Sequence, residues 1–207
     1  MRNLSDKICY IVGAADFREA PNPTACDFII AADGGYDKLK KIGITPNLLI
    51  GDMDSISEKP NGVELLKFKV EKDETDTHLA LLEGERRGYR NFLIYGGAGG
   101  RSDHTFANFS TLLFATRRGL CATLVADEWE AIIIENGKVE IPYGKYDGVS
   151  VFAFAGDAVG VTVAGAKYNC DNITLTADFP LGVSNSFLGE AISVEVRRGA
   201  LLIILRR

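Results

Sequence analysis

Two aspartates separated by one residue follow an apolar run in the first quarter of the chain. Asp52 and Asp54 belong to the motif Gly-Asp-Met-Asp-Ser, directly after the strand-like run 47–50. On extended backbone, side chains two residues apart project to the same side, so both carboxylates can reach one cation. A hard cation such as Mg²⁺ prefers oxygen ligands of this kind. Many such pairs are solvated turns, but the buried strand expected before this pair favours a metal site.

A second acidic motif opens a helical pattern further along the chain. Residues 72–77 read Lys-Asp-Glu-Thr-Asp-Thr. One Asp or Thr here could simply cap the helix, but a cap does not account for Asp73, Glu74 and Asp76 together. A helix N-terminus accepts phosphate, and nearby carboxylates suit a metal that is carried with it. This motif therefore predicts a phosphate site, where Lys72 could neutralise charge.

Two glycine-rich motifs lie between other apolar runs and helical patterns. Asp33, followed by two glycines, could contact a ligand or cap the next helix, and the sequence leaves both readings open. The loop 96–100 contains four glycines in five residues and precedes Arg101. Its backbone amides can bind an anion, and the guanidinium can bind phosphate. The loop matches neither the P-loop nor the dinucleotide-binding pattern, which disfavours those two classes of protein.

The elements around these motifs alternate between strand and helix. Apolar runs predict strands at 7–13, 27–32, 47–50, 68–70, 91–95 and 121–126, and helical patterns predict helices at 36–42, 76–87 and 103–118. Such alternation indicates crossover connections and a mostly parallel sheet flanked by helices. In a sheet of this kind ligands bind at the carboxyl ends of the strands, which is where the motifs fall.

After Asp127 the helical pattern stops and short strands follow one another. Asn136-Gly137, between runs at 130–135 and 138–141, predicts a β-hairpin with a type I′ turn. Further strands are expected at 149–155, 159–163, 173–176, 191–196 and 200–205, with Arg197 and Arg198 in the last hairpin turn. We therefore expect two domains: an α/β domain at 1–126 and an antiparallel β-sandwich domain at 127–207.

The overall composition restricts the partners. The chain has 207 residues and a formal net charge of -5, and its pI of about 5.2 argues against a nucleic-acid surface, which needs a basic face. No apolar run approaches the roughly 20 residues of a membrane span, and Met1–Lys7 lack the apolar core of a secretion signal. The four cysteines are scattered and predict free thiols. We expect a cytoplasmic protein with neither nucleic-acid nor membrane partners.

In their order and spacing, the motifs resemble those of the thiamine pyrophosphokinase family. They are Ala-Asp-Gly-Gly at 32–35, Gly-Asp-Met-Asp-Ser at 51–55, Lys-Asp-x-Thr-Asp at 72–76 and Gly-Gly-Arg-x-Asp-His at 99–104. Gly-Ala-Lys-Tyr at 165–168 and Gly-Val-Ser-Asn-Ser-Phe at 182–187 are also similar, so the resemblance covers nearly the whole chain. It implies an ATP-binding α/β domain, a β domain that contributes to thiamine binding, and a homodimer with active sites between subunits.

The resemblance also implies roles for individual residues. Asp52, Asp54 and Asp76 would hold magnesium, and together with Asp73 they form the expected catalytic set. The residues expected to bind ATP, the co-substrate, are Asp33, Gly34, Lys72, Thr75, Arg101, Asp103 and His104. Ser184 and Asn185 would contact the pyrimidine of thiamine, and Phe187 is a candidate for stacking on it.

The implied reaction transfers the diphosphate of ATP to the hydroxyl of thiamine, giving thiamine diphosphate and AMP. Such transfer depends mainly on positioning and charge neutralisation, and these motifs can supply both. Three other interpretations use the same motifs: a metal-dependent nucleotide-sugar glycosyltransferase, a nucleotide hydrolase, and a non-enzymatic module that senses a nucleotide or thiamine. Converging carboxylates are costly to hold together without a cation, which disfavours the sensing module.

Overall fold

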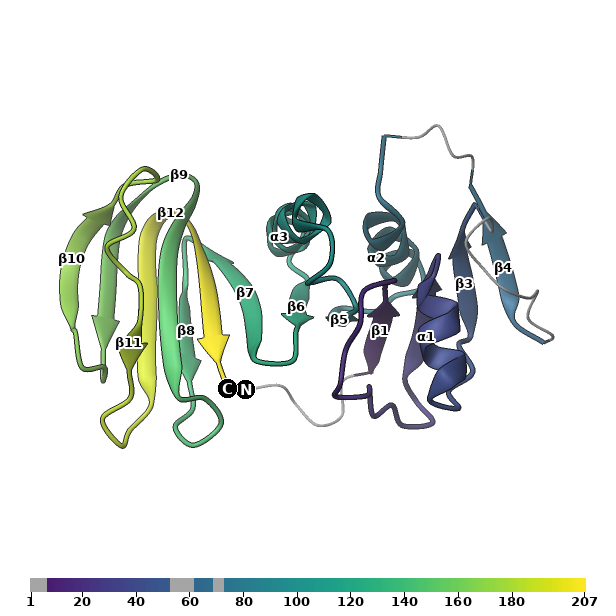
Figure 1. The fold of residues 1–207 in the computed structure, drawn as a ribbon. Helices are drawn as coiled ribbons and strands as arrows, with labels where there is room; N and C mark the ends of the chain where they lie inside the picture. The colour runs from purple at the N-terminus through teal and green to yellow at the C-terminus, as the bar shows by residue number, and fades with distance from the viewer. Residues whose placement is uncertain (1–6, 53–61, 69–72) are drawn as a thin grey trace. The chain divides into compact units, whose positions relative to one another are not determined.

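The computed structural model describes residues 7–52, 62–68 and 73–207. The chain divides into two compact units, Met1–Asp127 and Glu128–Arg207. Asp54 and Lys72, two of the residues predicted to bind magnesium or ATP, lie outside the described residues. The elements of the two units differ in kind, so that the protein as a whole has a mixed α/β fold (Figure 1).

The first unit is built on a parallel sheet with the strand order β6-β5-β1-β2-β3-β4. In chain order the strands are β1 (Ile8–Val12), β2 (Phe28–Ala32), β3 (Leu48–Gly51), β4 (Glu64–Lys67), β5 (Asn91–Tyr95) and β6 (Cys121–Val125). All of these neighbours pair in parallel. The carboxyl ends of the strands therefore meet at one edge of the sheet, as the sequence motifs require.

Helices cover both faces of this sheet. Neighbouring side chains of a strand point to opposite faces. On one face, Leu39 of α1 (Gly35–Lys41) belongs to the same buried cluster as Tyr10. On the other, Gly84 of α2 (Asp76–Arg86) lies so close to the sheet that an added Cβ would be 3.0 Å from Sγ of Cys9. Because Cys9 and Tyr10 are consecutive in β1, α1 and α2 lie on opposite faces (Figure 1).

The third helix, α3 (Ser102–Arg117), packs beside α2. Nδ1 of His78 lies 3.3 Å from Oγ1 of Thr111, and the His78 ring centroid is 4.5 Å from that of Phe114. Burial lowers the pKa of His78, which keeps the imidazole neutral at neutral pH. His78 therefore has a structural role, because it links α2 to α3.

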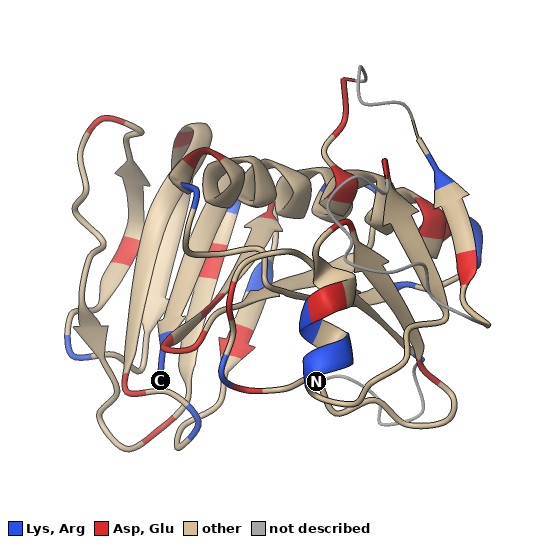
Figure 2. Cartoon of the chain, turned by 45° about the vertical axis from the view of Figure 1, so that its right-hand side comes forward, with Lys and Arg blue, Asp and Glu red and all other residues tan. Residues whose placement is uncertain are grey.

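The structure describes an edge strand directly before the strand predicted at 68–70. The edge strand of the sheet is β4, Glu64–Lys67, and Phe68 follows it. The remaining residues of that prediction, 69–70, lie outside the described part of the chain. The other strands of this sheet contain no charged residue, whereas β4 begins with Glu64 and ends with Lys67 (Figure 2). An exposed edge strand does not need a continuous apolar run, so the sequence pattern did not reveal it.

The second unit consists of antiparallel strands. They are β7 (Trp129–Glu135), β8 (Lys138–Ile141), β9 (Gly148–Ala164), β10 (Cys170–Leu175), β11 (Asn185–Ser186) and β12 (Ile192–Arg206). The strand order is β10-β9-β12-β7, with β11 paired to β9 and β8 paired to β12. Buried residues of β9, β10 and β12 form one hydrophobic cluster. No helix in the described part of the chain is long and apolar enough to cross a membrane.

Two pairs of predicted strands are single long strands in the structure. The runs at 149–155 and 159–163 form β9, and those at 191–196 and 200–205 form β12. Arg197 and Arg198 thus lie within a strand and not in a hairpin turn. The β9–β12 ladder shifts register between Arg198 and Ala200, at Gly199 with φ of 104°. The bend interrupts the apolar alternation without ending the ladder, which explains the error in the prediction.

The predicted hairpin at Asn136-Gly137 is also wrong. β7 and β8 flank this dipeptide, but both pair with β12. Asn136 has a positive φ of 48°, while Gly137 does not, so the turn is not type I′. Asn136 instead binds the bend of β12: its Oδ1 accepts a hydrogen bond from the Gly199 N–H at 2.9 Å. Long-range pairing with β12 therefore replaces the local pairing that the dipeptide favours.

Candidate functional site

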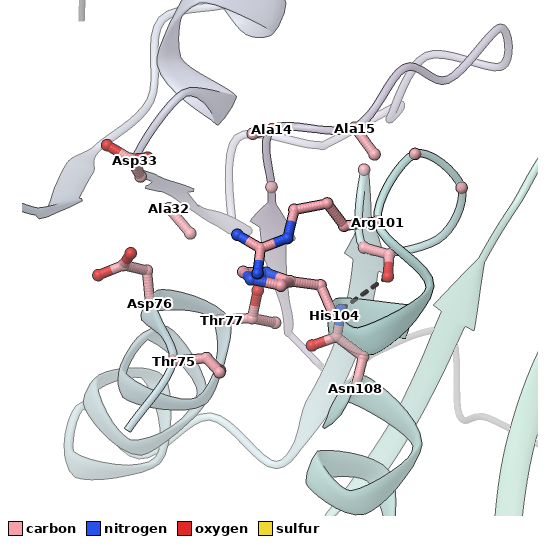
Figure 3. Close-up of a pocket in the computed structure, with 15 residues that line it drawn as sticks. Ala14, Ala15, Ala32, Asp33, Thr75, Asp76, Thr77, Arg101, His104 and Asn108 are labelled. Atoms are coloured by element: carbon pink, nitrogen blue, oxygen red, sulfur yellow. Dashed lines mark hydrogen bonds between the residues drawn. The ribbon is translucent and has the colours of Figure 1, made fainter. Parts of the chain in front are cut away.

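A cavity of about 410 Å³ lies at the carboxyl edge of the parallel sheet (Figure 3). It is bordered by the ends of β1 and β2, the first turn of α2, and the loop between β5 and α3. The lining residues are Gly13, Ala14, Ala15, Ala32, Asp33, Thr75, Asp76, Thr77, Gly96, Gly97, Gly99, Gly100, Arg101, His104 and Asn108. The cavity thus lies where a parallel sheet normally binds its ligand.

Two of the backbone loops that line the cavity are in contact with each other. The Ala15 N–H donates to the Gly96 carbonyl at 3.0 Å. A Cβ on Gly96 would lie 2.4 Å from the Gly13 carbonyl oxygen, and Gly96 has a φ of 61°. A side chain at this position is therefore excluded by space and by backbone conformation. The sequence pointed to the glycine loop, but it missed Gly13, Ala14 and Ala15, whose small side chains directly after β1 were the available signal.

Asp33 is held at the end of β2 beside the end of β3. Its N–H donates to the Ile50 carbonyl at 2.7 Å, its φ is 49°, and its Oδ1 is buried. A Cβ on Gly51 would lie 3.2 Å from the Asp33 Cα, so the chain passes close only because Gly51 lacks a side chain. Asp52 follows Gly51 directly. The backbone therefore brings these two acidic residues to neighbouring positions at one edge.

The first turn of α2 contributes polar groups to the cavity. Thr75 is the N-cap, and its Oγ1 accepts a hydrogen bond from the His78 N–H at 3.2 Å. Thr75, Asp76 and Thr77 line the cavity. Figure 3 shows the carboxylates of Asp33 and Asp76 on the same side of it. A helix N-terminus attracts anions, while two carboxylates attract cations, so this side suits a phosphate group that arrives with a metal.

Arg101 reaches over the cavity from the start of α3 (Figure 3). Its Nη2 donates to Oδ2 of Asp103 at 2.6 Å, and Oδ1 of Asp103 accepts from the His104 N–H at 3.0 Å. The hydrogen bond from Arg101 lowers the pKa of Asp103 to about 2. Asp103 does not line the cavity; its carboxylate holds the Arg101 guanidinium in position.

The structure brings together some of the predicted site residues and leaves others at its margin. Asp33, Thr75, Asp76, Arg101 and His104 line the cavity, whereas Gly34, Asp52, Asp73 and Asp103 do not. Asp54 and Lys72 are outside the described residues. Within the described residues, no group of three or more His, Cys, Asp or Glu side chains could hold a metal ion. Asn108 was not predicted, because an Asn in a helical pattern gives no signal of its own.

The second unit contains a separate cavity of about 400 Å³, lined by Asn185 among others. The Asn185 amide is committed to a neighbouring turn. Its Oδ1 accepts from the Tyr168 N–H at 2.9 Å, and its Nδ2 donates to the Tyr168 carbonyl at 2.7 Å. Ser184 does not line this cavity; it is exposed, with a φ of 59°. The ring centroid of Phe187 lies 6.1 Å from that of Tyr143. Because both hydrogen bonds of the Asn185 amide go to the backbone of Tyr168, this amide fixes the backbone of the exposed Tyr168.

Comparisons with known proteins match one family model to each of the two units of the chain. The model of the thiamin pyrophosphokinase catalytic domain matches residues 23–123, and that of the thiamin pyrophosphokinase vitamin B1 binding domain matches residues 135–201. The thiamine pyrophosphokinase of Bacillus subtilis (strain 168) is 27% identical over 182 residues, which cover 84% of this chain and 85% of that protein.

Solved structures show the same fold. The crystal structure of thiamine pyrophosphokinase from Bacillus subtilis is similar with a TM-score of 0.88 at 23% identity, over 97% of this chain and 99% of that one. Yeast thiamin pyrophosphokinase gives a TM-score of 0.79 at 17% identity, over 99% of this chain and 88% of that one. Since the two family models match both units of the chain, the chain belongs to the thiamine pyrophosphokinase family.

Proposed function

We propose that the cavity of the first unit binds ATP and carries out the reaction of the family, with residues 1–126 as the ATP-binding domain and 127–207 as the thiamine-binding domain. The family reaction transfers diphosphate from ATP to thiamine. The observation that carries the proposal is one cavity that combines a helix N-terminus, a guanidinium group and two carboxylates. The helix N-terminus and the guanidinium group can bind phosphate, and the carboxylates can bind a metal ion and attract a cationic substrate.

In this reaction, the thiamine hydroxyl oxygen forms a bond to the β-phosphorus of ATP. The bond between that phosphorus and the α–β bridging oxygen breaks, AMP leaves, and the hydroxyl proton is lost. Arg101 and the backbone amides at the start of α2 are suited to bind the phosphate oxygens, on which negative charge is spread during transfer. His104, beside Arg101 in the cavity wall, is proposed to contact the nucleotide.

Magnesium fits the oxygen donors at this edge of the sheet. Asp76 lines the cavity, and Asp52 follows the strand end that contacts Asp33. We propose that Asp52 and Asp76 hold the ion together with Asp54, and that Asp73, just before α2, belongs to the same acidic group. When bound, magnesium neutralises charge on the phosphate oxygens. The carboxylates themselves orient the ion and attract the cationic thiamine.

Thiamine binding is proposed to involve the second unit, whose antiparallel strands we propose to form a β-sandwich. We propose that Asn185 supports this site through the turn that presents Tyr168, since both hydrogen-bonding functions of its amide are engaged there. Ser184 is held by its backbone, because its N–H donates to Oγ of Ser150 at 3.1 Å. The exposed hydroxyl of Ser184 can therefore contact the aminopyrimidine.

Replacing Ser184 by Ala is expected to weaken thiamine binding by about 2- to 10-fold, the value of one neutral hydrogen bond. Affinity for ATP and the melting temperature should be unchanged, because the backbone contact to Ser150 remains. The measurement is KM for each substrate at saturating concentrations of the other. Ser186→Ala, two residues away in β11, is the matched control. An equal loss for both substrates, or a lower melting temperature with normal thiamine binding, would assign Ser184 to the turn alone.

We further propose that the enzyme is a cytoplasmic homodimer. The family resemblance and the apolar side chains exposed on the second unit, among them Tyr168, Phe179, Leu181 and Leu188, support this proposal. Sedimentation equilibrium at micromolar concentration should give about twice the chain mass of 22.4 kDa. A mass of a single chain under these conditions would contradict the dimer.

A further inference from the structure

The side chain of Asn108 is a buried amide in the wall of the cavity. Asn108 lies in α3, two turns after Arg101, and is 4% exposed. Its Nδ2 donates to the Gly97 carbonyl oxygen at 2.7 Å. The contact is tight, since a Cβ on Gly97 would lie 2.9 Å from that nitrogen. The amide therefore occupies one fixed position between the helix and the glycine loop.

The Gly97 carbonyl also determines which end of the amide faces the cavity. A carbonyl oxygen only accepts hydrogen bonds, so the nitrogen of Asn108 must face it and Oδ1 must face away. Figure 3 shows Oδ1 on the cavity side, beneath the ring of His104. No described residue donates a hydrogen bond to this oxygen. Asn108 thus presents a hydrogen-bond acceptor in a wall that otherwise holds Arg101 and His104.

An acceptor at this position selects among the parts of a nucleotide. The phosphate oxygens of ATP are themselves acceptors at neutral pH and gain nothing from Oδ1 of Asn108. The nucleoside half carries donors, namely the 6-amine of adenine and the ribose hydroxyls. Oδ1 of Asn108 faces the cavity, and a nucleotide bound there excludes water from it. An acceptor that is covered without receiving a donor costs free energy, so a ligand that supplies the donor is preferred over one that lacks it.

We propose that Asn108 is a specificity-determining residue whose Oδ1 accepts a hydrogen bond from the nucleoside half of ATP. The inference rests on the proposed role of the cavity as the ATP site. It places the nucleoside against α3 and leaves the phosphates to Arg101 and the start of α2. The hydrogen bond to Gly97 is the feature that keeps the acceptor turned toward the nucleotide.

The test compares nucleotide analogues in the wild-type enzyme and in Asn108→Leu, which has a similar volume and no acceptor. The analogues are purine riboside 5′-triphosphate, which lacks the 6-amine, and the 2′-deoxy and 3′-deoxy forms of ATP. For the analogue that lacks the contacting donor, wild-type kcat/KM should fall about 3- to 10-fold relative to ATP. The Asn108→Leu enzyme should use that analogue as well as it uses ATP. The analogue affected tells whether the donor is the amine or a hydroxyl.

Two further variants separate recognition from loop support. Asn108→Asp places an oxygen against the Gly97 carbonyl, so this variant disturbs the loop. It retains an acceptor, so kcat/KM for the analogue that lacks the contacting donor should still be lower than kcat/KM for ATP. If Asn108→Leu fails to fold, Asn108→Ala serves in its place, with calorimetry to confirm folding. Thr111→Val is the control: Thr111 is buried on the same helix, outside the cavity lining, and this variant should keep the wild-type analogue profile.

Three results would overturn the inference: a wild-type enzyme indifferent to all three analogues, a penalty that persists unchanged in the Leu and Ala variants, or a change confined to KM for thiamine. In each case the enzyme still converts ATP to AMP, and the proposed function stands. An enzyme that forms no AMP from ATP contradicts the proposed function itself, so the two failures are distinguishable.

Discussion

The Asp76→Asn enzyme is expected to lose about 10²- to 10³-fold in kcat and to remain folded. Asp76 lines the cavity from the first turn of α2, where its carboxylate lies on the same side as that of Asp33. Asparagine keeps the size and removes the charge, so the loss measures electrostatic stabilisation of the metal and of the phosphate groups. Steady-state turnover at saturating ATP, thiamine and magnesium measures it, and a thermal melt confirms the fold.

A matched control accounts for the position of Asp76 at a helix N-terminus. A carboxylate in the first turn stabilises a helix by about 0.3–1 kcal/mol, so part of any change could arise from α2 itself. Asp37 occupies the first turn of α1 and does not line the cavity. Asp37→Asn should therefore shift the melting temperature by a similar amount and keep normal kcat. If Asp76→Asn retained wild-type turnover at saturating magnesium, Asp76 would not be a metal ligand.

Replacing Arg101 by Ala is expected to lower kcat/KM for ATP by about 10- to 150-fold. The guanidinium reaches over the cavity and is anchored by Asp103. Hydrogen bonds to a charged group contribute about 1.5–3 kcal/mol, which gives this range. KM for thiamine at saturating ATP should change little. Arg101→Lys should restore only part of the activity, because a lysine does not reproduce the planar, bidentate donor set.

Two controls test whether Arg101 acts through contact with ATP. Asp103→Asn removes the charge that anchors the guanidinium but keeps the guanidinium itself, so its loss should be smaller. Arg118→Ala removes an arginine that pairs with Glu85, away from the cavity, and should leave kinetics unchanged. If Asp103→Asn were as impaired as Arg101→Ala, the ion pair and not the contact with ATP would explain the effect.

The sequence predicted the parallel sheet well because its inner strands are buried on both faces. β1, β2, β3 and β5 read as mainly apolar runs, and polar or glycine-rich motifs follow β2, β3 and β5. The order of runs and motifs along the chain is therefore enough to indicate which edge of the sheet holds the site. β4 does not share this signal, since it lies at the edge of the sheet with Glu64 and Lys67 exposed.

The second unit shows what local sequence cannot determine. Asn136-Gly137 favours a hairpin, but β7 and β8 pair with β12, which is distant in sequence. The bend of β12 at Gly199 likewise depends on its pairing with β9. Asn108 was missed for a related reason. Its role depends on the Gly97 carbonyl, and only the folded chain brings that group within 2.7 Å of the amide.

The products of one incubation test the central claim most directly. The purified chain is mixed with ATP, thiamine and magnesium, and the nucleotides and thiamine phosphates are separated by chromatography. Transfer of diphosphate predicts AMP and thiamine diphosphate in equal amounts, and removal of magnesium by a chelator should stop the formation of both. ADP with thiamine monophosphate would mean that a single phosphate is transferred, and AMP without thiamine diphosphate would mean hydrolysis. Either result would contradict the proposed diphosphate transfer.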